Sequence, residues 1–308
     1  MASYYSSDIV IGTRGSKLAL WQANYALKLM KAAFPHLSFS LKIIETKGDK
    51  LLYTALYKIG DKGLFTKELE NELLSGNIDL AVHSLKDLQT DLPEGLLLSA
   101  VLKRHNPCDV IIAKEKGLTI HTLEKSATVA TSSIRRIALL KNIRPDLNII
   151  DLRGNITTRI RKFEEGLFDY AILACAGVER IGLSDYISSY IPTDTFLPAV
   201  GQGALAIESR EDNLKLYDIL MAINDKTTEI EVSNERAFLK ELGGGCKTPI
   251  AALAQINDGV LEMEGLVAKS DGSTIIKEKI VAESIQIENI GKKLAHILIK
   301  KGADKLLI

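Results

Sequence analysis

Three times in this chain an apolar, strand-like run passes directly into a helical pattern through a junction that carries arginine. The junctions are Arg14-Gly15-Ser16, Thr131-Ser132-Ser133-Ile134-Arg135-Arg136 and Arg153-Gly154-Asn155. The first turn of a helix already carries partial positive charge from its unpaired N–H groups, so cations are disfavoured there. Arginine at several such helix starts therefore indicates that an anion is bound among them.

Strand and helix patterns alternate along the first part of the chain. Short apolar runs such as Ile9–Gly12, Ile78–His83 and Tyr170–Ala174 are each followed by a helical or turn segment. This alternation predicts mostly parallel α/β sheets. Ligands collect at the carboxyl ends of the strands in such sheets, where the three arginine junctions and the turn Ser84–Asp87 fall. Two α/β lobes facing each other would place these residues around one cleft for anions.

The pattern changes from about Asp225. A helix over Glu229–Leu242 ends in Gly243-Gly244-Gly245-Cys246, and three strands with turn signals and a helix near Ile290–Lys301 follow. This order predicts a separate α+β domain with a three-stranded antiparallel sheet. We expect a first α/β lobe over residues 1–103 and 203–221, a second over 107–198, and the C-terminal domain over 225–308.

The charge composition excludes a global preference for nucleic acid, because Lys+Arg and Asp+Glu both number 39. The arginines are nevertheless concentrated, since six of the eleven lie within residues 135–161. The planar guanidinium fork holds a carboxylate or a phosphate at two points, which lysine cannot do. A set of solvated helix faces is the competing interpretation for any single arginine.

The cysteine and histidine spacing favours neither a disulfide framework nor a metal site. The three cysteines are far apart with no CxxC pair, and the five histidines show no ligand spacing. The N-terminus lacks the pattern of a signal peptide, and no run approaches the ~20 apolar residues of a membrane span. We therefore expect a reduced, cytoplasmic protein with no membrane partner. We also expect a monomer.

Two residues stand out as candidates for chemistry. Asp87 lies beside Lys86 at the predicted end of a strand, where a carboxylate can act as a general acid–base or stabilise a cation. A turn aspartate bonded to its own backbone is the alternative. Cys246 follows three glycines, so its thiol is a candidate nucleophile or attachment point. A small buried side chain is the alternative for this cysteine.

Taken together, seven motifs in fixed order resemble the hydroxymethylbilane synthase family, also called porphobilinogen deaminases. They are Gly12–Gln22, Lys62–Phe65, Ala81–Asp87, Thr131–Arg136, Leu152–Asn155, Leu197–Ala204 and Gly243–Cys246. The resemblance implies two periplasmic-binding-protein-like lobes with mostly parallel sheets, plus the C-terminal α+β domain. It departs from the family pattern at Lys103–Asp109, where members usually carry a stretch ending in Asp-Pro-Arg-Asp.

The resemblance also implies an activity and a cofactor. Four porphobilinogen molecules would be joined head to tail, with loss of ammonia, into the linear tetrapyrrole hydroxymethylbilane. A dipyrromethane cofactor would be attached to Cys246 through a thioether. Asp87 would be the catalytic carboxylate that stabilises the cation left when ammonia departs.

The remaining site residues follow from the same motifs. Cofactor and substrate carboxylates are expected at Arg14, Ser16, Lys86, Thr131, Ser132, Ser133, Arg135, Arg136, Arg153, Gly154 and Arg159. Residues of the cleft or of a mobile loop are expected to be Lys58, Lys62, Phe65, Arg104, Arg180 and Gln202.

A non-catalytic solute receptor or ligand-sensing protein with the same two lobes is the alternative. Such a protein needs neither a carboxylate at a reaction centre nor a covalent cofactor. The missing signal peptide disfavours an exported receptor, and the missing DNA-binding helix pair disfavours a regulator.

Overall fold

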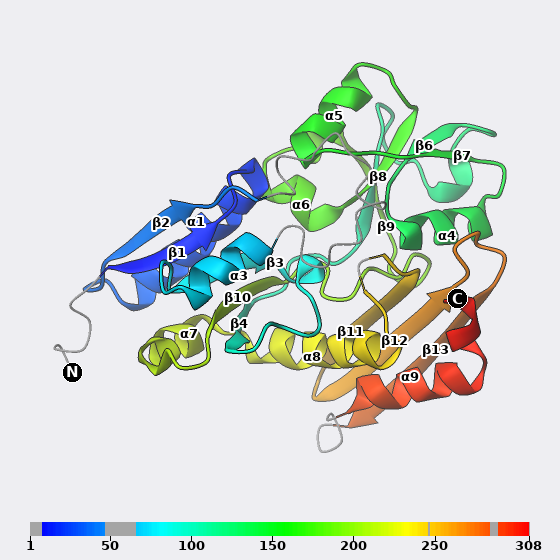
Figure 1. Cartoon of the computed structure of the whole chain (residues 1–308). Coiled ribbons are helices and arrows are strands. Elements are labelled where there is room, and N and C mark those ends of the chain that lie inside the picture. The colour runs from blue at the N-terminus through cyan, green and yellow to red at the C-terminus, as the bar shows by residue number, and fades with distance from the viewer. Residues whose placement is uncertain (1–7, 47–65, 246, 284–288, 308) are drawn as a thin grey trace. The chain divides into compact units, whose positions relative to one another are not determined.

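The computed structural model describes residues 8–46, 66–245, 247–283 and 289–307 (Figure 1). The chain divides into two compact units, of which the first comprises Met1–Arg104 and Ala204–Glu229 and the second His105–Gly203 and Ile230–Ile308. The second unit thus contains both the predicted second lobe and most of the predicted C-terminal domain. Their separation into two domains stays a prediction. Among the described residues, no helix combines the length and the hydropathy needed to cross a membrane.

The first unit is built on one five-stranded sheet of order β2-β1-β3-β10-β4. Its strands are β1 (Ile9–Thr13), β2 (Phe39–Ile43), β3 (Leu80–Ser84), β4 (Leu96–Leu102) and β10 (Leu205–Arg210). β1 pairs in parallel with β2 and β3, whereas β10 pairs antiparallel with both β3 and β4. Four of the five strands therefore run in one direction and β10 runs against them.

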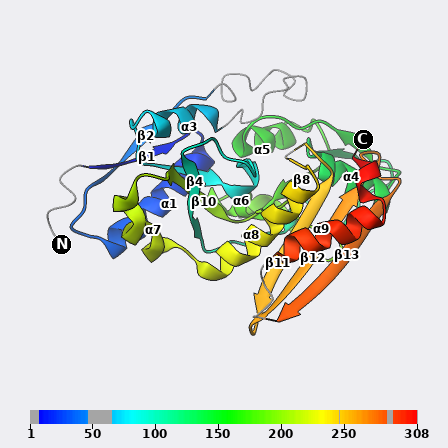
Figure 2. The ribbon, with the colours of Figure 1, turned by 60° about the horizontal axis from the view of Figure 1, so that its bottom comes forward.

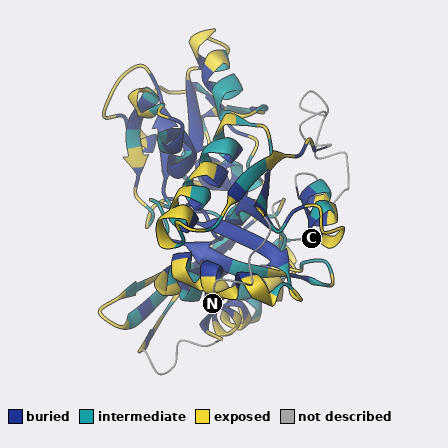
Figure 3. Ribbon diagram, turned by 90° about the vertical axis from the view of Figure 1, so that its left-hand side faces the viewer, coloured by how far each residue is buried: buried dark blue, intermediate teal, exposed yellow. Residues whose placement is uncertain are grey.

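Helices cover both faces of this sheet. They are α1 (Lys17–Ala33), α3 (Lys67–Leu74) and α7 (Tyr217–Ile223), with the short turns η1 (Leu85–Asp87) and η4 (Leu214–Leu216). Successive strand side chains point to opposite faces, so Ile9 and Ile11 pack with α1 and α7 while Val10 packs with α3. Buried residues fill the strands, and exposed residues lie on the outward faces of the helices and on the turns (Figure 3).

The second unit repeats this plan in a sheet of order β7-β6-β8-β5-β9. Its strands are β5 (Asp109–Ile112), β6 (Thr128–Ala130), β7 (Asn148–Ile150), β8 (Tyr170–Ala174) and β9 (Ile187–Ile191). The helices and turns of this part are α4 (Ile134–Ile143), α5 (Ile156–Glu164), α6 (Cys175–Arg180), η2 (Ile120–Thr122) and η3 (Ser184–Tyr186). β6 is parallel to β7 and β8, and β5 is antiparallel to β8 and β9. The predicted mostly parallel α/β class is confirmed, with one opposed strand in each sheet.

Each arginine junction of the sequence is a strand end followed by a capped helix. Ser16 accepts a hydrogen bond from the amide of Ala19, Ser133 from that of Arg136, and Asn155 from that of Thr158. A side-chain oxygen at this position satisfies one of the amides that the first turn leaves unpaired. The caps explain why these helices begin so soon after the strands.

A three-stranded antiparallel sheet forms the C-terminal part of the second unit, as predicted. It consists of β11 (Ile250–Asn257), β12 (Val260–Ala268) and β13 (Ile275–Glu283), with α8 (Lys226–Glu241), α9 (Ile290–Lys300) and η6 (Ala303–Leu306). α8 and α9 lie side by side on one face (Figure 2). A Cβ at Gly291 would lie 1.8 Å from the carbonyl oxygen of Asn234, so only glycine permits this approach of the two helices. Side chains of the other face, including Leu253 and Leu266, join the core around β6 and α4.

Candidate functional site

Two parallel strands of the first unit deliver candidate residues to one sheet edge. β1 is followed by Arg14 and Ser16, and β3 is followed by Lys86 and Asp87 in η1. Because β1 and β3 are parallel neighbours, their carboxyl ends meet at the same edge. Arg14 and Lys86 are half-buried, whereas Asp87 is exposed. The first unit thus brings two cations and one carboxylate to a common edge.

The backbone around Asp87 is held firmly. The side chain of Gln22 in α1 donates to the hydroxyl of Ser84 at 2.8 Å, which ties the helix to the end of β3. The amide of Leu85 donates to the carbonyl of Ala204, and the amide of Leu88 donates to the carbonyl of Leu85, both at 3.1 Å. The buried Leu85 anchors this single turn, so Asp87 projects from a fixed point.

Two parallel strands of the second unit present a further group of candidates. Thr131, Ser132 and Ser133 follow β6, and Arg153 and Gly154 follow β7. The Ser132 hydroxyl donates to the carbonyl of Leu152 at 2.6 Å and accepts from the amide of Leu152 at 3.0 Å. This double hydrogen bond joins the carboxyl ends of the two strands.

Gly154 has a conformation and a surrounding that exclude other residues. Its φ angle is 105°, and a Cβ there would lie 2.7 Å from the side chain of Thr158. The carbonyl of Gly154 accepts a hydrogen bond from Arg159 Nε at 2.8 Å. The turn after β7 therefore requires glycine, and it draws the Arg159 guanidinium toward the strand end.

Arg153, which follows β7, already has an acidic partner in this chain. Asp151 forms an ion pair with Arg153. Partial burial opposes ionisation of Asp151, but the Ser132 hydroxyl and the charges of Arg153 and Arg159 lower its pKa below the ordinary value. This part of the second unit therefore already stabilises one carboxylate.

Arg135 and Arg136, predicted to bind ligand carboxylates, are deeply buried, with 3% and 6% of their surface exposed. Their Nη2 atoms donate to the two oxygens of Asp109, each at 2.7 Å. Their Nη1 atoms donate to the carbonyls of Leu197 at 2.8 Å and Ile172 at 3.0 Å. Within the described part of the chain, neither buried Nε has a hydrogen-bond partner. Both arginines thus hold the fold together, and each has one buried guanidinium nitrogen, Nε, that makes no hydrogen bond within the described residues.

Asp109 is the buried partner of both arginines, and it was not among the candidates predicted from the sequence. Burial alone would raise its pKa, but the two guanidiniums outweigh that effect and hold the pKa well below its usual range. The side chain of Gln202, only 1% exposed, also donates to Asp109 at 2.9 Å and to the carbonyl of Pro107 at 2.7 Å. The signal that could have identified it is an aspartate at the start of an apolar strand, because a buried carboxylate needs partners.

The remaining candidates are distributed over both units. In the first unit, the amide of Arg104 donates to the hydroxyl of Thr228 at 3.1 Å. In the second unit, the buried Arg180 donates from Nη2 to the carbonyl of Gly203 at 2.7 Å. Four further predicted residues lie outside the described residues, namely Lys58, Lys62, Phe65 and Cys246.

These features define a class of protein: two α/β lobes, each presenting basic and hydroxyl side chains at the carboxyl ends of parallel strands. Comparison with protein families gives the narrower assignment. Residues 9–218 match the family model described as "Porphobilinogen deaminase, dipyromethane cofactor binding domain", and residues 229–300 match "Porphobilinogen deaminase, C-terminal domain". The chain belongs to the porphobilinogen deaminase family.

Curated relatives agree with this assignment. A porphobilinogen deaminase of Syntrophomonas wolfei is 48% identical over 300 residues, covering 97% of this chain and 98% of the relative. The protein of the same name from Chlorobaculum parvum is 46% identical over 303 residues, with 97% of each chain covered. The resemblance stated from the sequence motifs is confirmed, and a solute receptor is not favoured.

Solved structures with a similar fold are more distant. A probable amino-acid transporter extracellular-binding protein, YtmK of Bacillus subtilis, has a TM-score of 0.45 at 16% identity, covering 76% of this chain and 97% of that one. The methionine-binding protein MetQ has a TM-score of 0.43 at 14% identity, with coverages of 74% and 94%. Similarity at this level carries no argument about function.

The second unit fits a polyanionic cofactor such as a dipyrromethane, whose acidic side arms need donors. Buried donors without a partner are rare in folded proteins and call for an explanation. Arg135 Nε and Arg136 Nε are two such donors on the first turn of α4, directly after Ser132 and Ser133. A bound carboxylate would satisfy them.

Proposed function

We propose that this chain condenses four porphobilinogen molecules head to tail, releasing one ammonia per addition, and that one water molecule is then consumed to release the product as hydroxymethylbilane. This is the activity of the porphobilinogen deaminase family, a transferase reaction of tetrapyrrole biosynthesis. The observation that carries the proposal is the match of both family models over residues 9–218 and 229–300. The curated relatives, identical at 45–48% over nearly the whole chain, support it.

The cofactor expected from the sequence is confirmed at the level of the family, because the matched first model is the dipyrromethane cofactor-binding domain. We place its attachment at Cys246, through a thioether, because this cysteine ends the triple-glycine motif. When bound, the cofactor supplies the pyrrole end on which the product grows.

Asp87 is the residue we assign to the chemistry. As the C–N bond of a substrate breaks, ammonia leaves with the electron pair and positive charge develops on the pyrrole. An ionised carboxylate near the pyrrole N–H stabilises that charge. After the new C–C bond forms, the ring carbon of the pyrrole that attacked this cation must lose its proton, and the same carboxylate can take it. The exposed position of Asp87 on a rigid turn suits both tasks.

The basic and hydroxyl residues are assigned to binding. Arg14, Ser16 and Lys86 of the first unit, and the donors that follow β6 and β7 of the second, are matched to acetate and propionate groups. Arg135 and Arg136 contribute through their Nε atoms, because their Nη1 and Nη2 atoms already bond to two carbonyls and to Asp109. Their ion pairs with Asp109 keep both guanidiniums oriented.

The test is a turnover measurement with the purified full-length chain. We expect four porphobilinogen molecules consumed and four ammonia molecules released per tetrapyrrole formed. The intact protein should weigh more than its chain by one dipyrromethane, and Cys246→Ser should remove that excess. Binding of porphobilinogen without release of ammonia would instead indicate the solute receptor.

The oligomeric state and the compartment belong to the same proposal. We propose a monomer that acts in the cytoplasm, in keeping with the absence of CxxC pairs from the sequence. Light scattering of the purified protein tests the first part, since a dimer would double the measured mass. Fractionation of the producing cells tests the second.

A further inference from the structure

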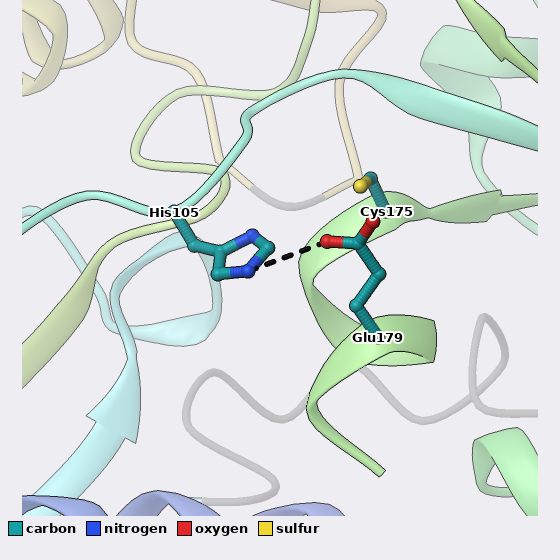
Figure 4. Close-up of side chains that lie close together, drawn as sticks. All are labelled: His105, Cys175 and Glu179. Carbon is teal, nitrogen blue, oxygen red and sulfur yellow. Dashed lines mark ion pairs between the residues drawn. The ribbon is translucent and has the colours of Figure 1, made fainter. Parts of the chain in front are cut away.

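Three side chains able to bind a soft divalent metal lie together in the second unit, next to a further buried cysteine, Cys108, and the proposed reaction uses none of these four residues. The ligating atoms of His105, Cys175 and Glu179 all lie within 4.8 Å of one another (Figure 4). Cys108 lies against Cys175, whose backbone amide donates to the Cys108 carbonyl at 3.1 Å. We propose that these four residues, here named the thiol–imidazole cluster, bind one zinc ion.

The fold explains why residues so far apart in sequence meet. Cys175 and Glu179 are the first and fifth residues of α6, and this spacing places both on one face of the helix. Cys108 immediately precedes β5 and lies opposite Cys175. The amide of Cys175 donates to the Cys108 carbonyl at 3.1 Å. His105 precedes Cys108 by three residues. The sequence gives no metal-binding spacing because the ligands come from two separate segments.

Backbone contacts hold these ligands in place. The amide of His105 donates to the carbonyl of Gly203 at 3.2 Å, and a Cβ at Gly203 would lie 2.4 Å from the His105 carbonyl oxygen. The amide of Cys108 donates to the side chain of Asn106 at 3.0 Å. Ligands fixed in advance lose less conformational freedom when a metal binds, which favours affinity.

The distances suit a tetrahedral site after a small adjustment. His105 Nε2 lies 3.3 Å from Glu179 Oε2, close to the separation of about 3.4 Å that ligand bonds of ~2.1 Å give in a tetrahedron. The other separations among His105, Cys175 and Glu179 must shorten by about 1 Å, and the thiol of Cys108, which is not one of these three ligands, must rotate toward them. Tyr190 donates to the other oxygen of Glu179 at 2.7 Å, so it orients the carboxylate and leaves Oε2 for the metal.

One rearrangement is required. The amide of Asn106 donates to His105 Nδ1 at 2.8 Å, so the ring proton is on Nε2 and faces Glu179. A metal at Nε2 needs this proton on Nδ1, where it would face the N–H of Asn106, so the ring must tilt away from that amide. The His105 side chain is 38% exposed and has room to turn. Binding therefore breaks one hydrogen bond, and we expect weaker affinity than in a fully preformed zinc site.

The ligand set selects zinc over the hard cations. Two sulfur ligands disfavour Mg²⁺ and Ca²⁺, whereas thiolate, imidazole and carboxylate together suit Zn²⁺. Each thiol loses one proton as its Zn–S bond forms, so two protons are released. The resulting cluster carries one net negative charge, which the buried Arg180 beside Glu179 offsets. The partly exposed His105 and Glu179 provide access for the ion.

Cobalt(II) provides a direct test, because it binds at zinc sites and reports its ligands by colour. The cofactor-bound full chain, reduced with a phosphine and freed of metal by a chelator, is titrated with Co²⁺ alone. We expect thiolate-to-cobalt charge-transfer bands that saturate at one Co²⁺ per chain and disappear when Zn²⁺ is added. His105→Ala and Glu179→Gln should weaken Co²⁺ binding at least ~10-fold, and Tyr190→Phe about 10-fold.

Two controls make the result specific. His36→Ala alters an exposed histidine outside the cluster and should leave the bands unchanged. Cys246→Ser should also retain them, because the proposed thiolates are Cys108 and Cys175. Cys175→Ser should remove most of the charge-transfer intensity. Circular dichroism verifies that each variant is folded. If the variant at the buried Cys175 does not fold, the variants at the partly exposed His105 and Glu179 still test the proposal.

Either of two outcomes overturns the proposal. One is the absence of charge-transfer bands in the reduced protein. The other is bands that persist at wild-type affinity in both His105→Ala and Glu179→Gln. A third measurement is the intact mass before reduction. If that mass is two hydrogens lower than expected and the reduced protein binds no cobalt, Cys108 and Cys175 form a disulfide instead.

Discussion

The carboxylate of Asp109 lies 2.7 Å from the guanidinium of Arg135, and both side chains are almost wholly buried. Arg136 approaches the other carboxylate oxygen at the same distance. The anion implied by arginine at this helix start is therefore supplied in part by the chain itself. One carboxylate orients two guanidiniums, each of which keeps a buried Nε for a ligand.

Replacing Asp109 by Asn should destabilise the protein strongly. Removing one partner of a buried ion pair leaves charge uncompensated and costs about 3–5 kcal/mol. Urea unfolding measures the loss, with Asp218→Asn, at an exposed position on α7, as the matched control that should stay within about 0.5 kcal/mol. A loss near that of the control would show that the buried pair contributes nothing.

Lowering the pH should remove the contribution of Asp109 to the free energy of unfolding. The pKa of Asp109 is held below its usual value in the folded protein, so the folded state binds fewer protons than the unfolded state during titration of this group. Its stabilisation is complete above the unfolded pKa of about 3.9 and is lost as the pH falls through the lower folded pKa. The stability difference between wild type and Asp109→Asn should therefore shrink below about pH 4. Unfolding curves from pH 7 to 3 give this difference, and a constant value would contradict the assignment.

Asp87→Asn should abolish turnover while leaving the fold intact. Loss of a general acid–base group costs roughly 10²–10⁴ in rate, and loss of charge stabilisation adds to this. Because Asp87 is exposed, the free energy of unfolding should change by less than about 0.5 kcal/mol. Ammonia release and urea unfolding are measured together, with Glu94→Gln as the exposed acidic control. Near-normal turnover in Asp87→Asn would mean that another acid performs the reaction.

Arg135→Lys and Arg136→Lys should separate the structural role of these residues from the binding role. Lysine can keep a charge near Asp109, but it lacks the fork and the Nε donor. We expect cofactor loading, measured by intact mass, to fall more steeply than stability in both variants. Substitution by leucine should lower both together, because it leaves Asp109 short of a partner. Full loading in both lysine variants would exclude a role for the Nε atoms.

Gly154→Ala should impair substrate binding and stability. The φ angle of 105° is strained for alanine, and the new methyl group would meet the side chain of Thr158. A loss of roughly 1–3 kcal/mol is expected, together with a raised KM. Gly166→Ala is the matched control, because Gly166 also has a positive φ of 72° but meets no atom of the described residues within 4 Å. If both substitutions lower stability and raise KM equally, the contact with Thr158 is not the cause.

Local features could be predicted from the sequence because they are determined by neighbouring residues. Ser16, Ser133 and Asn155 mark helix starts, and alternating strand and helix patterns gave the fold class. Strand direction could not be predicted in the same way, because a short apolar run looks alike in both directions. The opposed strands β5 and β10 therefore appeared only in the structure.

The candidate site was predictable where it consists of local motifs, such as the turn that carries Asp87. Partners far apart along the chain were not predictable. Asp109 meets Arg135 across 26 residues, and His105 meets Glu179 across a longer interval, with nothing in either segment to specify the other. Their pairing depends on sheet order, which becomes defined only when the strands assemble.

The position of β10 between β3 and β4 has a consequence during synthesis on the ribosome. Until residues Leu205–Arg210 have left the exit tunnel, β3 and β4 lack their shared neighbour. The nascent chain must therefore carry an incomplete sheet with open edges while about a hundred further residues are translated. Open sheet edges promote aggregation. Newly synthesised chains should therefore depend on chaperones for longer than other proteins of this length.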